Sequence, residues 1–311
     1  MSNLSRALFT VFLLVTSFGL FASDAQIYLK LNKEHCFNGD GRFPEITEES
    51  ISDVLNWTAI LEEGCNIEAL HIEGEITWET LQTFRKTLNT ANRFYLLHES
   101  QDYMNFVVDS NGGLIEPALK IGEMVANSPA FFALEVPEES VCFSSCIFIY
   151  AAAEIRNVYG KVGIHRPFTH ELDPSIASYS EYLSIYKTLT PTLKDYLVKF
   201  GVSPKLIDDM NVIPSDEIKI LSLRQRNEYG LGADNIAAKE YRKALKIKHC
   251  GADYVDLERR FHAVISKCQN EIGFSDYSKC ESFAKTAFPD FRGGRESRCV
   301  ESLPTRKIKF F

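Results

Sequence analysis

Segments with the pattern of strands alternate with segments of helical pattern between residues 69 and 165, and this alternation constrains the fold more than any other feature. Strands are predicted over 69–76, 105–108, 131–136 and 158–165, and helices over 78–91, 114–126 and 146–153. Alternating strands and helices build a mostly parallel sheet with helices on its faces. We therefore expect an α/β fold in which the turns that follow the strands gather along one edge of the sheet, where open sheets bind ligands.

The flanking regions differ from this alternating part of the chain. A further strand is predicted over 26–31, and the residues after 165 are polar and mainly helical. Beyond a boundary near Asn235 the chain becomes rich in Lys, Arg and Cys. We therefore expect an α/β domain over 26–235 and a small helical, cysteine-containing region over 236–311, held by disulfides because small modules need such staples.

The first 25 residues have the three-part pattern of a signal peptide. Arg6 precedes a run of mostly apolar residues over 7–21, and small residues surround a cleavage point after Ala25. An uncleaved anchor helix is the alternative, but the apolar run is shorter than the roughly 20 residues that a spanning helix needs. We expect an exported protein, periplasmic or secreted, with no stable membrane span after cleavage.

The chain has eight cysteines, which in an exported protein suggest disulfides rather than metal ligands or redox thiols. They fall into an early pair, a close central pair and a late group of four: Cys36 and Cys65; Cys142 and Cys146; Cys250, Cys268, Cys280 and Cys299. Pairing within each group is the simplest arrangement, although the sequence leaves the connectivity open. The chain has neither a CxxC nor an HExxH motif, so we expect no metal and no cofactor.

Composition excludes one class of partner. The hydrophobic and charged fractions, 45% and 24%, are ordinary for a globular protein. The formal net charge is -8, and this argues against nucleic acid as a partner because binding to phosphates needs a basic surface.

Three short segments together fit the chemistry of a serine hydrolase: DSNGGLI over 109–115, VCFSSCIFIYAAA over 141–153 and GIHRP over 163–167. A serine nucleophile needs a base within hydrogen-bond reach and donors for the oxyanion. Ser144 precedes a predicted helix, His165 ends the next predicted strand, and the Ser145 N–H would face an oxyanion. Gly112 and Gly113 would present a further N–H, because glycine lets the backbone approach a substrate closely.

These motifs resemble the Clp protease proteolytic subunit and its crotonase-fold relatives. The resemblance rests on Asn111-Gly112-Gly113, on Ser144 ahead of CIFIYAAA, and on Ile164-His165-Arg166-Pro167. It extends over about 69–231, and it is strongest to exported Clp-like proteins with a Cys-X-Ser-X-Cys motif. The resemblance implies a ClpP/crotonase-like fold, Ser144 as nucleophile, His165 as base and a Gly-Gly turn in the oxyanion hole.

The third member of such a triad is less clear from the sequence. Counting back from Glu228-Tyr229-Gly230-Leu231, which resembles a segment after the acidic residue of the family, leads to Asp216. Asp208, Asp209 and Glu217 lie nearby. A carboxylate at Asp216 would orient His165 and stabilise its charged form; the alternative is that Asp216 caps a helix after Pro214.

Three other interpretations remain open at this stage. Ser145 is a rival nucleophile, but Ser144 occupies the position that matches the motif. Ala153 stands where the family has glycine, which fits a catalytically inactive Clp-like protein that binds or scaffolds in the cell envelope. A thiol enzyme that uses Cys142 or Cys146 is the third interpretation.

The function predicted from the sequence is therefore an exported serine hydrolase that acts as a peptidase on a peptide or protein substrate. The inactive binding or scaffold protein is the alternative. Assembly into a homo-oligomer is compatible with both.

Overall fold

The structure is a computed structural model that describes residues 25–32, 67–97, 103–128, 130–167, 179–272, 277–289 and 291. Cys36, Cys65 and Cys299 lie outside this part of the chain. No helix within the described ranges is long and apolar enough to cross a membrane.

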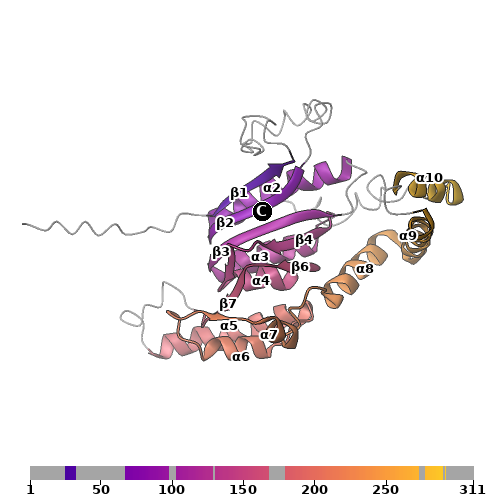
Figure 1. Ribbon diagram of the computed structural model, residues 1–311. Helices are drawn as coiled ribbons and strands as arrows, with labels where there is room; N and C mark the ends of the chain where they lie inside the picture. The colour runs from indigo at the N-terminus through magenta and orange to yellow at the C-terminus, as the bar shows by residue number, and fades with distance from the viewer. Residues whose placement is uncertain are drawn as a thin grey trace, which may run out of the picture.

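The strands form a sheet that branches at β3 (Met104–Gly113), one of its two longest strands (Figure 1). One branch consists of β1 (Gln26–Leu31), β2 (Ile67–Ile76), β3, β4 (Phe132–Val136) and β6 (Ile155–Val158). The other continues from β3 through β5 (Val141–Phe143) and β7 (Lys161–Ile164) to β8 (Lys219–Ile220). Pairing is parallel except at the two outer pairs, β1 with β2 and β7 with β8. The predicted α/β class with a mostly parallel sheet is confirmed.

Three helices lie against the sheet: α2 (Trp78–Leu97), α3 (Ile115–Ala126) and α4 (Cys146–Ala152). α2 packs on β1 and β2, and α3 lies between α2 and α4. Every residue of α4 is buried, as the run of apolar residues over 146–153 predicted for a fully enclosed helix. The sheet and these helices share one hydrophobic core.

A second group of helices covers the other side of α4: α5 (Tyr179–Lys199), α6 (Lys205–Asn211) and α7 (Leu223–Glu228). The buried Tyr196 of α5 donates its hydroxyl hydrogen to the carbonyl of Phe148 at 3.0 Å. α7 begins with a capping box in which Ser222 and Gln225 satisfy each other's backbone amides. α4, which follows Ser144, is therefore enclosed by the sheet and by α5.

The predicted strand over 158–165 begins too early, because β7 covers only Lys161–Ile164 and Val158 is the last residue of a separate strand, β6. β6 ends at Val158 and β7 begins at Lys161, and the two strands belong to different branches of the sheet. At Gly160 between them a Cβ would lie 2.1 Å from the carbonyl oxygen of Pro137. Only glycine fits this close approach, and the chain can turn there into the second branch.

Arg156 forms hydrogen bonds that link the carboxyl end of α4 to the residues that follow α7. Its side chain is 2% exposed and donates to the carbonyls of Tyr150 and Ala151, at 2.9 and 2.6 Å. It also donates to the carbonyls of Gly230 and Gly232, at 2.8 and 3.3 Å. These bonds satisfy carbonyls at a helix end that would otherwise be orphaned. Burial lowers the pKa of Arg156 to about 10.

The C-terminal helices are α8 (Ile236–Cys250), α9 (Ala252–Ile272) and α10 (Tyr277–Ala287). α8 begins on the α/β domain, where its cap Asn235 donates to the carbonyls of Ala151 and Ala153 and Arg242 pairs with Glu154 at 2.7 Å. α9 and α10 enclose a separate small hydrophobic cluster. The disulfide Cys268–Cys280 joins these two helices, and Cys250 is disulfide-bonded as well.

Replacing Arg156 with Met should destabilise the fold strongly, because it leaves several buried carbonyls without donors. Each such group costs roughly 1–3 kcal/mol, so we expect a loss of at least about 3 kcal/mol in the free energy of unfolding. Urea denaturation monitored by circular dichroism measures the change. The control is Arg259→Ala on the exposed face of α9, which should change stability by no more than about 0.5 kcal/mol. Equal effects of the two changes would contradict the assigned role of Arg156.

Candidate active site

Ser144 lies in the turn between β5 and α4 with a left-handed backbone. Its φ is 55°, and it is the only residue other than glycine with positive φ in the described part of the chain. A left-handed backbone costs an L-residue roughly 1–2 kcal/mol, and such strain is concentrated at functional sites. The serine nucleophiles of α/β-hydrolases occupy a comparable strained strand-to-helix turn, which exposes the hydroxyl.

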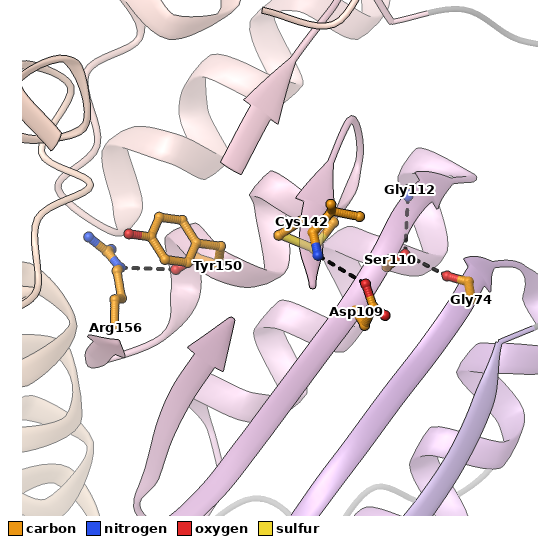
Figure 2. The surroundings of a disulfide bond; sticks show 9 residues. Gly74, Asp109, Ser110, Gly112, Cys142, Tyr150 and Arg156 are labelled. Atoms are coloured by element: carbon orange, nitrogen blue, oxygen red, sulfur yellow. Dashed lines mark hydrogen bonds between the residues drawn. A yellow bond between two sulfur atoms is a disulfide. The ribbon is translucent and has the colours of Figure 1, made fainter. Parts of the chain in front are cut away.

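Two backbone hydrogen bonds and a disulfide hold the Ser144 turn. The Ser144 N–H donates to the carbonyl of Gly163 at 3.1 Å, and the Ser144 carbonyl accepts from Ile147 at 3.1 Å. Cys142 and Cys146 form a disulfide that joins the residues on either side of the turn, and both are fully buried (Figure 2). Neither sulfur is a free thiol, so the thiol-enzyme interpretation is wrong.

The Gly-Gly turn at the end of β3 lies directly against Ser144. A Cβ added to Gly112 would lie 2.6 Å from Ser144 Cβ, 2.7 Å from the carbonyl oxygen of Phe143 and 3.0 Å from Ser145 N. The φ of Gly112 is also positive, at 97°. The structure thus brings together the glycine pair and the serine, which are more than 30 residues apart in the sequence. The predicted glycine turn is part of β3 in the structure, and Gly113 is the last residue of that strand.

His165 follows β7, the strand that lies next to β5. Phe143 pairs with Gly163 across these parallel strands. Ser144 comes one residue after this pair and His165 two residues after it, so both lie at the carboxyl ends of neighbouring strands. Neighbouring strands are about 4.8 Å apart, a separation that a serine and a histidine side chain can bridge.

The imidazole of His165 is buried, and a backbone carbonyl fixes one of its nitrogens. It is 4% exposed, and Nδ1 lies 2.9 Å from the carbonyl oxygen of Arg166. A carbonyl oxygen can only accept, so Nδ1 must carry the hydrogen in this bond. In the neutral ring Nε2 then carries the lone pair, which is the tautomer that a general base acting through Nε2 requires.

Asp216 does not share the buried environment of His165. It is exposed, in a turn between α6 and β8, and among the described contacts its carboxyl group makes no hydrogen bond to the ring. The segment that contains it does lie beside β7, because Arg166 N–H donates to the carbonyl of Ile213 and Lys219 pairs with Ile164. The role of Asp216 as the orienting acid stays a prediction.

The structure distinguishes the two adjacent serines. Ser144 is half-buried, whereas Ser145 is 1% exposed and its hydroxyl has no hydrogen-bond partner among the described groups. A nucleophile must be reached by its substrate, so the geometry favours Ser144. No cluster of three or more potential metal-ligating side chains occurs within the described residues.

Two solved structures that match part of the chain have the following names and degrees of similarity. An alanine variant of the membrane-bound stomatin-specific protease 1510-N, in complex with a substrate peptide, is 17% identical with a TM-score of 0.40, over 52% of this chain and 70% of that one. ClpP1 from Listeria monocytogenes is 20% identical with a TM-score of 0.39, over 57% of this chain and 93% of that one. No protein-family model matches the chain, and no curated protein matches it either.

Two side chains that the sequence analysis did not single out join β3 to its neighbours (Figure 2). Asp109 Oδ1 accepts from Val141 N–H at 2.9 Å, which links β3 to the start of β5. The hydroxyl of Ser110 links β3 to β2 through Gly74. Both residues belong to the DSNGG motif, in which Asn111 separates them from the glycine pair, and membership of this motif was the available signal.

Replacing Gly112 with Ala should displace the Ser144 turn, because the added methyl group would overlap Ser144 Cβ. The matched control is Gly251→Ala, since Gly251 has φ 88° but nothing lies within 4 Å of an added Cβ. The control should lose only the conformational cost of its backbone, roughly 1–3 kcal/mol. We expect Gly112→Ala to lose roughly 1–3 kcal/mol more, as overpacking does. Urea denaturation of both variants measures the free energy of unfolding. Equal losses in the two variants would show that Gly112 is not packed against Ser144.

Proposed function

We propose that this chain is an exported serine peptidase in which Ser144 is the nucleophile and His165 the general base. The observation that carries the proposal is the strained turn at Ser144, packed against Gly112 and placed at the end of the strand next to the one that His165 follows. A left-handed serine at a strand-to-helix turn has a structural cost that a catalytic role explains.

In the proposed reaction, His165 Nε2 takes the proton of the Ser144 hydroxyl as the oxygen attacks the carbonyl carbon of a peptide bond. The resulting imidazolium then gives this proton to the leaving amine, and an acyl-enzyme forms. A water molecule, deprotonated by the same nitrogen, releases the acid product and restores the serine. The Nδ1–H bond to the Arg166 carbonyl holds the ring in the required tautomer throughout.

The oxyanion would be bound by the backbone amides of Gly113 and Ser145. The Gly112 N–H donates to Ser110 Oγ at 3.1 Å, so Gly112 contributes its lack of a side chain rather than its amide. Leu114 N–H donates to the carbonyl of Ile76 at 2.7 Å, and successive amides of a strand point in opposite directions. The Gly113 amide is therefore directed away from β2, toward the side on which β5 lies.

The proposal places the mature protein in an oxidising compartment outside the cytoplasm. The predicted cleavage point after Ala25 lies immediately before β1, so a mature chain that begins at Gln26 keeps the whole strand. Disulfides such as Cys142–Cys146 and Cys268–Cys280 persist in oxidising compartments. The substrate would be a peptide or protein, and self-assembly into a homo-oligomer is compatible with the site.

The experiment that tests the proposal is labelling of the mature protein with a fluorophosphonate probe. Wild type should be labelled on Ser144, and Ser144→Ala should not be labelled at all. His165→Ala should be labelled at least about a hundredfold more slowly, because proton transfer by a positioned side chain contributes 10²–10⁴-fold. Equal labelling of wild type and Ser144→Ala would falsify the hydrolase assignment and favour an inactive binding or scaffold protein.

The contribution of Asp216 can be measured with the same probe. Because the Arg166 carbonyl holds Nδ1 and Asp216 is exposed, we expect Asp216→Asn to change the labelling rate by less than about threefold. An orienting carboxylate of a triad contributes about 10⁴-fold in the best-known case. A loss of that order would show that Asp216 contacts the ring during the reaction. Asp253→Asn on α9 is the control for the change of charge.

A further inference from the structure

Ser110 lies where the ladder between β2 and β3 is interrupted. Glu73 pairs with Asp109 and Glu75 pairs with Gly112, so the regular register breaks between these two pairs. Within the break, Ser110 Oγ donates to the carbonyl of Gly74 at 2.6 Å and accepts from the Gly112 N–H at 3.1 Å (Figure 2). One hydroxyl thus joins a carbonyl of β2 and an amide of β3 across the break in register.

This bridge needs a group that donates and accepts at the same point. A hydroxyl has one donor and two acceptor positions, whereas an aliphatic side chain has neither. Ser110 is 1% exposed, so water does not readily replace the hydroxyl. Removal of this oxygen would take one hydrogen-bond partner from the buried Gly112 N–H and one from the half-buried Gly74 carbonyl, and Gly112 would shift toward another acceptor.

The bridge is connected directly to the nucleophile. Gly112 has no room to move toward Ser144, as the 2.6 Å distance from an added Cβ to Ser144 Cβ shows. Ser110 also pairs with Cys142 across β3 and β5, and Cys142 is one end of the disulfide around Ser144. A shift at Ser110 would therefore reach Ser144 through the glycine turn and through β5.

We propose that Ser110 is a positioning residue, which holds the Gly112–Gly113 turn at the distance from Ser144 that catalysis needs. The assignment rests on the proposed function, because it concerns the geometry of the same site. Ser110 does not touch the reacting atoms; it fixes Gly112 N–H, and through Gly112 it sets the place of the Gly113 amide.

The chain offers a matched control in Ser128. Ser128 is 2% exposed, donates its hydroxyl hydrogen to Asn92 and accepts from the N–H of Ala130 at 3.2 Å. Like Ser110, it donates one hydrogen bond and accepts one from the amide two residues ahead, although it donates to a side-chain oxygen and the Ala130 N–H also lies 3.3 Å from Asn92 Oδ1. It follows α3, however, and contacts neither the glycine turn nor Ser144.

The experiment compares Ser110→Ala and Ser128→Ala with wild type by fluorophosphonate labelling of Ser144 at increasing probe concentrations. Ser110→Ala should lower the limiting rate of labelling at least about tenfold, because small misplacement of catalytic groups costs up to about a hundredfold. The probe concentration at half-maximal rate should stay within about twofold, since uniform binding is not affected. In urea denaturation, Ser128→Ala should lose about as much stability as Ser110→Ala, but it should keep the wild-type labelling rate.

Each outcome decides the proposal. Labelling of Ser110→Ala at the wild-type rate overturns the positioning role and leaves the hydrolase assignment intact. Equal slowing in Ser110→Ala and Ser128→Ala overturns it too, because loss of stability then explains both. Wild type that is not labelled on Ser144 overturns the positioning role together with the proposed function. If Ser110→Ala does not fold, Ser110→Cys, with its weak donor in nearly the same volume, must show the slowing instead.

Discussion

The left-handed backbone of Ser144 is the constraint on which the arrangement of the candidate site depends. Its conformation is unfavourable for an L-residue, so it persists only because surrounding contacts determine it. Those contacts come from three directions: the carbonyl of Gly163 on β7, the Cys142–Cys146 disulfide, and Gly112 at the end of β3. The branching of the sheet brings them together, because β3 pairs with β4 along its first half and reaches β5 only near its end.

Much of the fold could be predicted from the sequence because its main elements have local periodic patterns. The 26–31 strand, and the helices after the glycine pair and after Ser144, are found within one residue of the predicted bounds. The turn at 159–160 that separates β6 from β7 could not be predicted, because it depends on the approach of Pro137 to Gly160. β5 was missed since three residues are too few to show a period.

The sequence indicated the components of the site better than the connections between them. Ser144, Gly112 and His165 stood out because residue type and order matched one mechanism, and the fold brings their strand ends together. The prediction for Asp216 came from counting along the chain, whereas the partner of a ring nitrogen is decided in space. In the structure Nδ1 of His165 lies 2.9 Å from the carbonyl oxygen of Arg166, a backbone group that no sequence motif specifies, and the role of Asp216 stays a prediction.

The two disulfides described here differ in their surroundings, and this difference has a consequence for the behaviour of the protein in a reductant. Cys268–Cys280 joins two helices around a cluster too small to be stable alone, and Cys268 is partly exposed. Both sulfur-bearing residues of Cys142–Cys146 are fully buried in the large hydrophobic core. Thiol attack requires access to a sulfur atom. The protein should therefore yield to reduction in stages, with the terminal helices loosening while the serine turn remains oxidised.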